Sequence, residues 1–116
     1  MTPEGLVKKR VKKVLEEYGV YKHMPVMNGM GKQTLDFITC AWGRFLAIET
    51  KAEGNKPTEN QYRIMKEIRD SGGFAIVVEG VGEVDTVLIP ILNWLRGARH
   101  GNAGNGTPSA VDKTTV

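Results

Sequence analysis

Two β-rich runs, residues 33–40 and 45–51, limit the possible folds of this chain more than any other segment. They are separated by the four residues Ala41-Trp42-Gly43-Arg44, a spacing typical of an antiparallel β-hairpin. A symmetric loop centred between Trp42 and Gly43 places Asp36 directly opposite Glu49. The sequence therefore predicts a hairpin that carries two acidic residues at its open end.

The acidic pair needs a positive partner. Directly opposed residues have Cβ atoms about 4.5–5.5 Å apart, and like charges at that distance repel. Lys51 lies two residues after Glu49, so it projects from the same strand face. We expect Asp36, Glu49 and Lys51 to share one small surface, which suits a hard cation such as Mg²⁺. In the alternative interpretation, Glu49 and Lys51 form an exposed ion pair and Asp36 is solvated. A register shift of one residue would also separate the acids.

Capping and periodicity predict the other elements. Thr2, Pro3 and Gly19 bound a first helix over about residues 3–18. Its apolar stripe is headed by Glu4, whose carboxylate is expected to point toward the body of the protein. A strand over residues 20–27 contains Pro25, which places it at a sheet edge or ends its pairing early.

The second half of the chain completes the predicted fold. After a polar loop, Pro57 and Thr58 open a second helix that ends near residues 71–73. Residues 74–78 are apolar on both faces, which predicts a buried central strand. Beyond residue 84 we expect two short helices that meet at Pro90.

Length and composition favour one soluble domain. The chain has 116 residues, of which 41% are apolar and 25% charged. We expect a single domain over residues 1–96 and a glycine-rich, disordered tail over residues 97–116. The longest apolar run, residues 74–78, is too short to span a membrane, and the N-terminus does not read as a secretory signal. A reducing, cytoplasmic setting is expected, since Cys40 has no partner for an intramolecular disulfide.

Single residues with reactive side chains are given structural roles. Cys40 is expected to be a small buried residue near the hairpin turn, neither a nucleophile nor a zinc ligand. His23 and His100 have no partner at ligand spacing. Trp42 and Trp94 are expected to pack against neighbouring side chains.

The first helix concentrates positive charge. Residues 1–13 hold five basic residues and one acidic residue, a local charge of +4; because the whole chain carries +3, the remainder carries −1. A focused basic patch is typical of a surface that binds phosphates, although it can equally be a solvated helix face. The candidates for DNA binding are Lys8, Lys9, Lys12 and Lys13.

These residues together resemble a known family. Asp36, the hairpin, Ile48-Glu49-Thr50-Lys51 and Gln61 early in the next helix are similar to the PD-(D/E)XK nuclease superfamily, in its small VRR-NUC type. The resemblance runs from about Glu4 to Val78 and departs at Leu35, which replaces the proline before the first acid. It implies an α/β fold with a restriction-endonuclease-like αβββαβ core, in which helices flank a mixed central sheet.

The resemblance also implies roles for individual residues. Asp36, Glu49 and the Thr50 carbonyl would hold Mg²⁺, or Mn²⁺ in its place, with Glu4 contributing from the first helix. Lys51 would orient the attacking water or stabilise the transition state. Gln61 would position Lys51 or the substrate phosphate, although Thr58-x-x-Gln61 also matches a helix capping box.

The function implied is a Mg²⁺-dependent DNA endonuclease that leaves a 5′-phosphate and a 3′-hydroxyl. The small size favours recognition of junction, flap or nicked structures over sequence readout. We expect a homodimer joined by the apolar stripe over residues 88–95, and a bacterial or phage genome as the source. The alternative is a module on a nuclease-like fold that binds nucleic acid or a partner protein without cutting.

Overall fold

The computed structural model describes residues 1–26 and 34–99 of the chain. The described elements follow the predicted order of one helix, three strands, a helix, a strand and a final helical segment. In chain order they are α1 (Pro3–Glu17), β1 (Tyr21–His23), β2 (Phe37–Ala41), β3 (Arg44–Lys51), α2 (Glu59–Asp70), β4 (Phe74–Glu79), η1 (Val84–Leu88) and α3 (Ile89–Arg99).

The four strands form one mixed sheet in the order β1-β2-β3-β4. β1, β2 and β3 pair antiparallel, and β4 runs parallel to β3. The turn between β2 and β3 consists of Trp42 and Gly43, whose φ angles of 51° and 84° suit the tight hairpin turn that follows the twist of the strands. Phe37 pairs with Ile48, so the predicted register is confirmed and Asp36 comes opposite Glu49.

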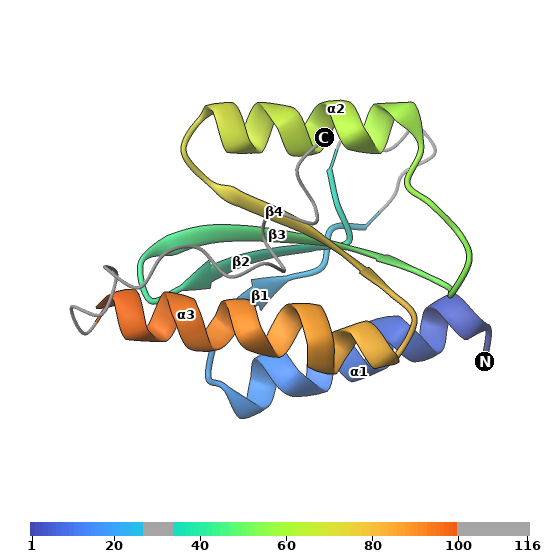
Figure 1. Ribbon diagram of the computed structural model, residues 1–116, viewed down its shortest axis with the longest axis horizontal. Helices are drawn as coiled ribbons and strands as arrows, with labels where there is room; N and C mark the ends of the chain where they lie inside the picture. Colours follow the sequence, from blue (N-terminus) through green and yellow to red (C-terminus); the bar gives the residue numbers. More distant parts are fainter. Residues whose placement is uncertain (27–33, 100–116) are drawn as a thin grey trace.

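Helices cover both faces of the sheet (Figure 1). α2 lies on one face, above a small apolar cluster that includes Ala47, Met65 and Ala75. α1 and the η1–α3 segment lie on the other face and enclose the main core, to which Leu46 and Ile48 of β3 contribute. The expected α/β fold with a mixed sheet between helices is confirmed.

The first helix forms as its caps predict. The Thr2 hydroxyl accepts a hydrogen bond from the Gly5 N–H at 3.0 Å, which satisfies one of the free donors of the first turn. Gly19 adopts φ 69°, a conformation that ends the helix at low cost. Val7, Val11, Val14 and Leu15 are buried, as the apolar periodicity predicts.

The two outer strands differ from the sequence prediction. β1 pairs only over Tyr21–His23, shorter than the predicted 20–27, and it ends before Pro25, which has no N–H to donate to a ladder. The prediction that residues 74–78 form a central strand is wrong, because β4 is at the edge of the sheet. Its apolar character arises because helices cover both of its faces rather than because strands flank it on both sides. The predicted loop over residues 28–32 lies outside the described residues.

The C-terminal segment is one continuous helical stretch from Val84 to Arg99. Its first part is a π-helical turn, in which the Ile89 N–H donates to the Val84 carbonyl just before Pro90. The wider turn accommodates the proline ring and its missing N–H, so Pro90 does not divide the segment into separate helices. α3 also includes Gly97–Arg99, which were expected to belong to the tail; residues 100–116 lie outside the described part.

The apolar stripe over residues 88–95 does not form the predicted dimer surface. Four of its five leucine and isoleucine side chains are fully buried in the main core, namely Leu88, Ile91, Leu92 and Leu95, and the fifth, Ile89, is partly buried and packs against the same core. Trp94 packs edge-on against Phe74 and Trp42 against Tyr18, as expected for aromatic residues that pack on neighbours. Within residues 1–26 and 34–99, no helix is long and apolar enough to cross a membrane.

Candidate active site

Glu49 and Lys51 project from β3 toward the layer that contains α2. Side chains alternate along a strand, and Ala47 packs in the cluster beneath α2 whereas Leu46 and Ile48 face the main core. Glu49 and Lys51 therefore follow Ala47 on the α2 side. The strand places an acid and a base two residues apart at its carboxyl end, as the sequence predicts.

Glu49 is a buried carboxylate with several polar partners. Its side chain is 1% exposed. Oε2 accepts a hydrogen bond from Gln61 Nε2 at 2.8 Å and lies 3.6 Å from Lys51 Nζ. Oε1 accepts from the Asp36 main-chain N–H at 3.2 Å. Taking a carboxylate out of water is costly unless it is paired and hydrogen-bonded, and these groups supply both forms of compensation.

Asp36 comes directly before β2, and its carboxylate lies against the end of β3. Oδ2 accepts from both the main-chain N–H of Thr50, at 2.9 Å, and the Thr50 hydroxyl, at 2.6 Å. Oδ1 lies 3.6 Å from Lys8 Nζ on α1. The expectation of one shared strand face is thus too simple: Glu49 is held from the α2 side, whereas Asp36 is held from β3 and α1. The Asp36 N–H, which donates to Glu49, connects the two acids. Asp36, Glu49, Lys8 and Lys51 are called the acidic cluster below.

Gln61 makes both kinds of contact that the sequence allows, one in the helix cap and one with the acidic residues. Its main-chain N–H donates to the Thr58 hydroxyl at 3.2 Å, and its Oε1 accepts from the Thr58 N–H at 2.9 Å, which completes a capping box at the start of α2. Its Nε2 is left to reach Glu49. One buried amide therefore fixes the start of α2 against the carboxylate on β3.

Glu4 does not join the two acids in a three-ligand group. It lies in the first turn of α1, partly buried, one helical turn before Lys8. In the described part of the chain, no group of three or more His, Cys, Asp or Glu side chains could hold a metal ion. The pair of Asp36 and Glu49 still fits Mg²⁺, because this ion is usually held by one or two carboxylates together with water and substrate phosphates.

The four lysines predicted to bind DNA do not lie in equivalent positions. Lys8 is partly buried and faces Asp36, whereas Lys9, Lys12 and Lys13 are exposed. Successive helix positions are rotated by about 100°, so Lys9 and Lys13 point away from the buried stripe and from Asp36. Sequence reasoning missed the place of Lys8 in the acidic cluster. The available signal was its position directly beside the buried Val7 and one turn after Glu4.

Two other sequence predictions can be compared with the structure. Cys40 is exposed on β2, so the prediction of a buried cysteine is wrong; it alternates with the buried Thr39 and Ala41 and faces solvent near the hairpin turn. His23 is exposed on the edge strand β1, apart from the acidic cluster. The structure gives neither residue a place in the candidate site.

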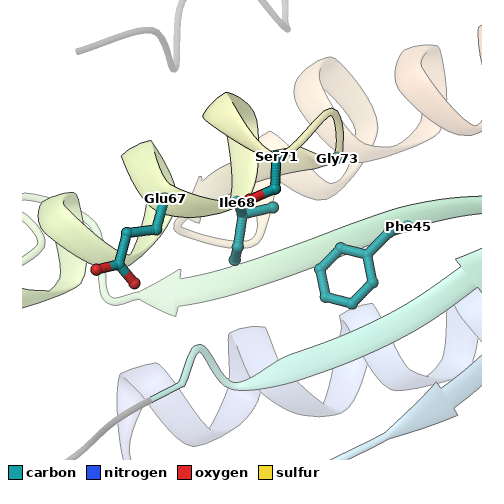
Figure 2. A pocket seen from close by; sticks show the side chains of 5 residues that line it. All are labelled: Phe45, Glu67, Ile68, Ser71 and Gly73. Atoms are coloured by element: carbon teal, nitrogen blue, oxygen red, sulfur yellow. The ribbon is translucent and has the colours of Figure 1, made fainter.

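An open hollow of about 450 Å³ lies at the far end of the same sheet face. Figure 2 shows Ile68 of α2 and Ser71, the residue directly after α2, near the ring of Phe45, which is in β3. Phe45 and Glu49 are four residues apart, which corresponds to roughly 13 Å along a strand. The hollow and the carboxylate cluster are therefore separate features.

The end of β4 lies beside Lys51 and contacts the loop that follows it. Glu79 pairs in register with Lys51 and accepts hydrogen bonds from Lys56 Nζ at 2.8 Å and from the Gly54 N–H at 3.1 Å. The hydrogen bond to Glu79 raises the pKa of the exposed Lys56 ammonium. These contacts fasten the loop after Lys51 to the neighbouring strand.

Comparison with known proteins supports the fold described above. No family model matches the sequence, and no curated protein does. A solved structure described as a VRR_NUC domain matches with a TM-score of 0.67 and 26% sequence identity. The match covers 77% of this chain and 97% of that one. The resemblance inferred from the sequence motifs is therefore confirmed: the chain is similar in fold and in sequence to a VRR_NUC nuclease domain.

Proposed function

We propose that this chain is a Mg²⁺-dependent endonuclease that hydrolyses phosphodiester bonds in DNA. The observation that carries the proposal is the buried acid Glu49, held by Lys51 and Gln61 beside Asp36 at the end of β3. A buried acid and a partly buried acid so close together destabilise a fold unless positive groups offset them, so function is the natural reason to keep them. The similarity to a VRR_NUC domain also supports a nuclease function.

Each residue has a stated part in the proposal. Asp36, Glu49 and the Thr50 carbonyl would hold the ion, and Glu4 on α1 would contribute through a bound water. A divalent ion at such a site supplies charge that stabilises the phosphate in the transition state and a bound water of lowered pKa. Lys51 would orient the attacking water or the phosphate through its ammonium, and its side chain is 14% exposed. Gln61 keeps Glu49 in place.

The preferred substrate in this proposal is DNA of unusual shape, such as a nick, a flap or a four-way junction. The described domain is small, and the positive groups near the site are lysines, which act on phosphates as point charges rather than as base readers. Lys8, Lys9, Lys12 and Lys13 on α1 would provide contacts to the phosphate backbone. The products would carry a 5′-phosphate and a 3′-hydroxyl.

Cleavage assays test the proposal directly. Labelled duplex, nicked, flapped and four-way DNA are incubated with the protein in Mg²⁺, in Mn²⁺ and in EDTA. Cleavage of at least one substrate is expected in both metals and none in EDTA, and a resulting nick should be sealed by DNA ligase, which requires a 5′-phosphate. Binding of DNA without any cleavage would favour the non-catalytic module instead.

Matched variants connect the activity to this site. Lys51→Ala and Glu49→Gln are expected to lower the cleavage rate by at least about 100-fold, the loss typical when a group that stabilises transition-state charge is removed. Lys56→Ala is the control: it removes the same charge from an exposed lysine that pairs with Glu79 outside the cluster. Equal losses in Lys51→Ala and Lys56→Ala would contradict the assignment.

A homodimer and a bacterial or phage-infected cytoplasm also belong to the proposal. Two copies would supply two active sites for two DNA strands. Leu88, Ile91, Leu92 and Leu95 are fully buried within the core, so they are not available for the interface. Sedimentation velocity across a range of concentrations measures the oligomeric state, and a monomer at every concentration would exclude the dimer.

A further inference from the structure

The two acids of the candidate site each face a lysine, and the two lysines come from different elements. Lys51 is on the same strand as Glu49, and their charged atoms lie 3.6 Å apart. Lys8 comes from α1, and its Nζ lies 3.6 Å from Asp36 Oδ1. The similarity of the two pairs shows that Lys8 is part of the acidic cluster rather than only of the helix surface.

Lys8 differs from Lys51 in its access to solvent. The Lys8 side chain is 36% exposed, whereas that of Lys51 is 14% exposed. A lysine at the border of a buried stripe keeps its aliphatic stem on the protein and can move its ammonium among nearby acceptors. The separation of 3.6 Å is an ion pair without a short hydrogen bond, so little geometry is lost when the ammonium moves.

Thr50 and Lys8 approach different oxygens of the Asp36 carboxylate. Thr50 donates two hydrogen bonds, both to Oδ2, and these fix the carboxylate on β3. Lys8 approaches the other oxygen, Oδ1. A divalent ion bound at Oδ1 would be repelled by an ammonium at the same atom, because both are positive.

We propose that Lys8 is an exchangeable counter-ion of Asp36: its ammonium neutralises the carboxylate until a divalent ion binds there, and it then turns to a phosphate of the bound DNA. This inference rests on the metal site of the proposed function. It gives Lys8 a positioning role that Lys9 and Lys13, exposed on the outer face of α1, do not share. It also couples the binding of metal to the binding of DNA.

Metal binding in the absence of DNA is the first test. The affinity of the full chain for Mn²⁺ is measured by electron paramagnetic resonance, and for Ca²⁺ by calorimetry. Lys8→Gln is expected to bind each ion about tenfold more tightly than the native protein, the factor for an ammonium held roughly 6 Å from a divalent ion in a water-like dielectric. Lys8→Arg keeps the charge and is expected to bind as the native protein does.

Lys9→Gln is the matched control. It removes the same charge from the neighbouring helix position, farther from Asp36, where salt screens the interaction. Its metal affinity is expected to change by less than about twofold. Unchanged or weaker metal binding in a folded Lys8→Gln protein, verified by its melting curve, would overturn the proposal.

DNA binding provides the second test. Affinity for four-way DNA is measured in EDTA and in Ca²⁺, an ion that generally does not support cleavage by magnesium enzymes. Lys8→Gln is expected to bind like the native protein in EDTA and about tenfold more weakly in Ca²⁺, the loss of one phosphate contact. Lys9→Gln is expected to lose the same factor in both solutions. Equal losses for Lys8→Gln in EDTA and Ca²⁺ would assign Lys8 to the general helix surface and overturn the exchange.

The outcomes separate this inference from the proposed function. Tighter metal binding by Lys8→Gln together with a lack of cleavage on every substrate would support the exchange and contradict the nuclease. Metal-dependent cleavage by the native protein, together with unchanged metal affinity in Lys8→Gln, would support the nuclease and contradict the exchange. A native protein that binds no divalent ion would contradict both.

Discussion

Replacement of Gln61 by glutamate tests whether the amide on α2 holds the buried acid of β3. The change keeps the shape of the side chain and keeps Oε1 as the acceptor for the Thr58 N–H. It replaces only the Nε2 group, which donates to Glu49 Oε2 at 2.8 Å, with a second carboxylate oxygen. The capping box tolerates either glutamine or glutamate, so the start of α2 is retained.

The expected cost is about 3–5 kcal/mol of unfolding free energy at neutral pH, the range found when a buried charge loses its partner. A hydrogen bond to a charged group contributes about 1.5–3 kcal/mol, and this bond is lost. Two negative charges about 4 Å apart then repel by about 4 kcal/mol at an effective dielectric constant of 20. Lys51, 3.6 Å from Glu49, offsets part of that repulsion.

Urea denaturation of three variants isolates this contact. Gln61→Glu is compared with Thr58→Ala, which removes only the helix cap and is expected to cost about 1 kcal/mol. The double variant Glu49→Gln with Gln61→Glu exchanges donor and acceptor, so it restores the hydrogen bond with its direction reversed. Its stability is expected to recover to within about 1.5 kcal/mol of the native protein, because a coupled pair is not additive.

Two results would contradict this reasoning. If Gln61→Glu costs no more than Thr58→Ala, the contact between Gln61 and Glu49 contributes nothing beyond the cap. If the double variant is as unstable as the sum of its single changes, the two side chains are not coupled. Activity gives an independent measurement, since the double variant moves the carboxylate away from β3 and is expected to remain inactive while it is stable.

Three further predictions concern the surroundings of the site. Thr50→Val removes the hydroxyl that donates to Asp36 and is expected to cost about 2 kcal/mol in urea denaturation, the value for a hydrogen bond to a charged group; a cost near zero would show that the bond does not stabilise the fold. Leu92→Ala is expected to lower the unfolding free energy by about 2–5 kcal/mol without a change in sedimentation coefficient, because Leu92 is a core residue; a smaller assembly in this variant would show that Leu92 lies at an interface between copies. Lys66→Ala breaks an exposed pair with Asp70 and is expected to change stability by less than about 0.5 kcal/mol, a control for the urea measurements.

The hairpin was predictable because its determinants are local. The turn Trp42-Gly43 fixes the pairing of β2 with β3, and once the turn is centred, the position of Asp36 opposite Glu49 follows. The caps of α1 and α2 are also local, since Thr2 and Thr58 act within one helical turn. Interactions between residues close in sequence therefore predict the hairpin, the start of both helices and the placement of Asp36 opposite Glu49.

The errors concern which parts of the chain meet in space. Residues 74–78 are as apolar as an interior strand, yet β4 is at the sheet edge, because burial by two helical layers and burial between strands leave the same apolar pattern. The stripe over residues 88–95 has the same ambiguity. Apolar periodicity shows that a helix face is covered, but the core and a second protein molecule are equally apolar. Only the packing of α3 against the sheet decides between them.

The position of Lys8 shows how a long-range contact changes the interpretation of a charge pattern. Along the sequence, Lys8 is one of four similar lysines, and charge density alone gives each the same role. Folding places the flank of α1 that carries Lys8 against the end of β3, while the outer face of the same helix remains exposed. The cluster then holds the carboxylates of Asp36 and Glu49 together with the ammonium groups of Lys8 and Lys51. Because each carboxylate lies near an ammonium group, the buried Glu49 and the partly buried Asp36 can be held close together before any ligand binds, which a functional site requires.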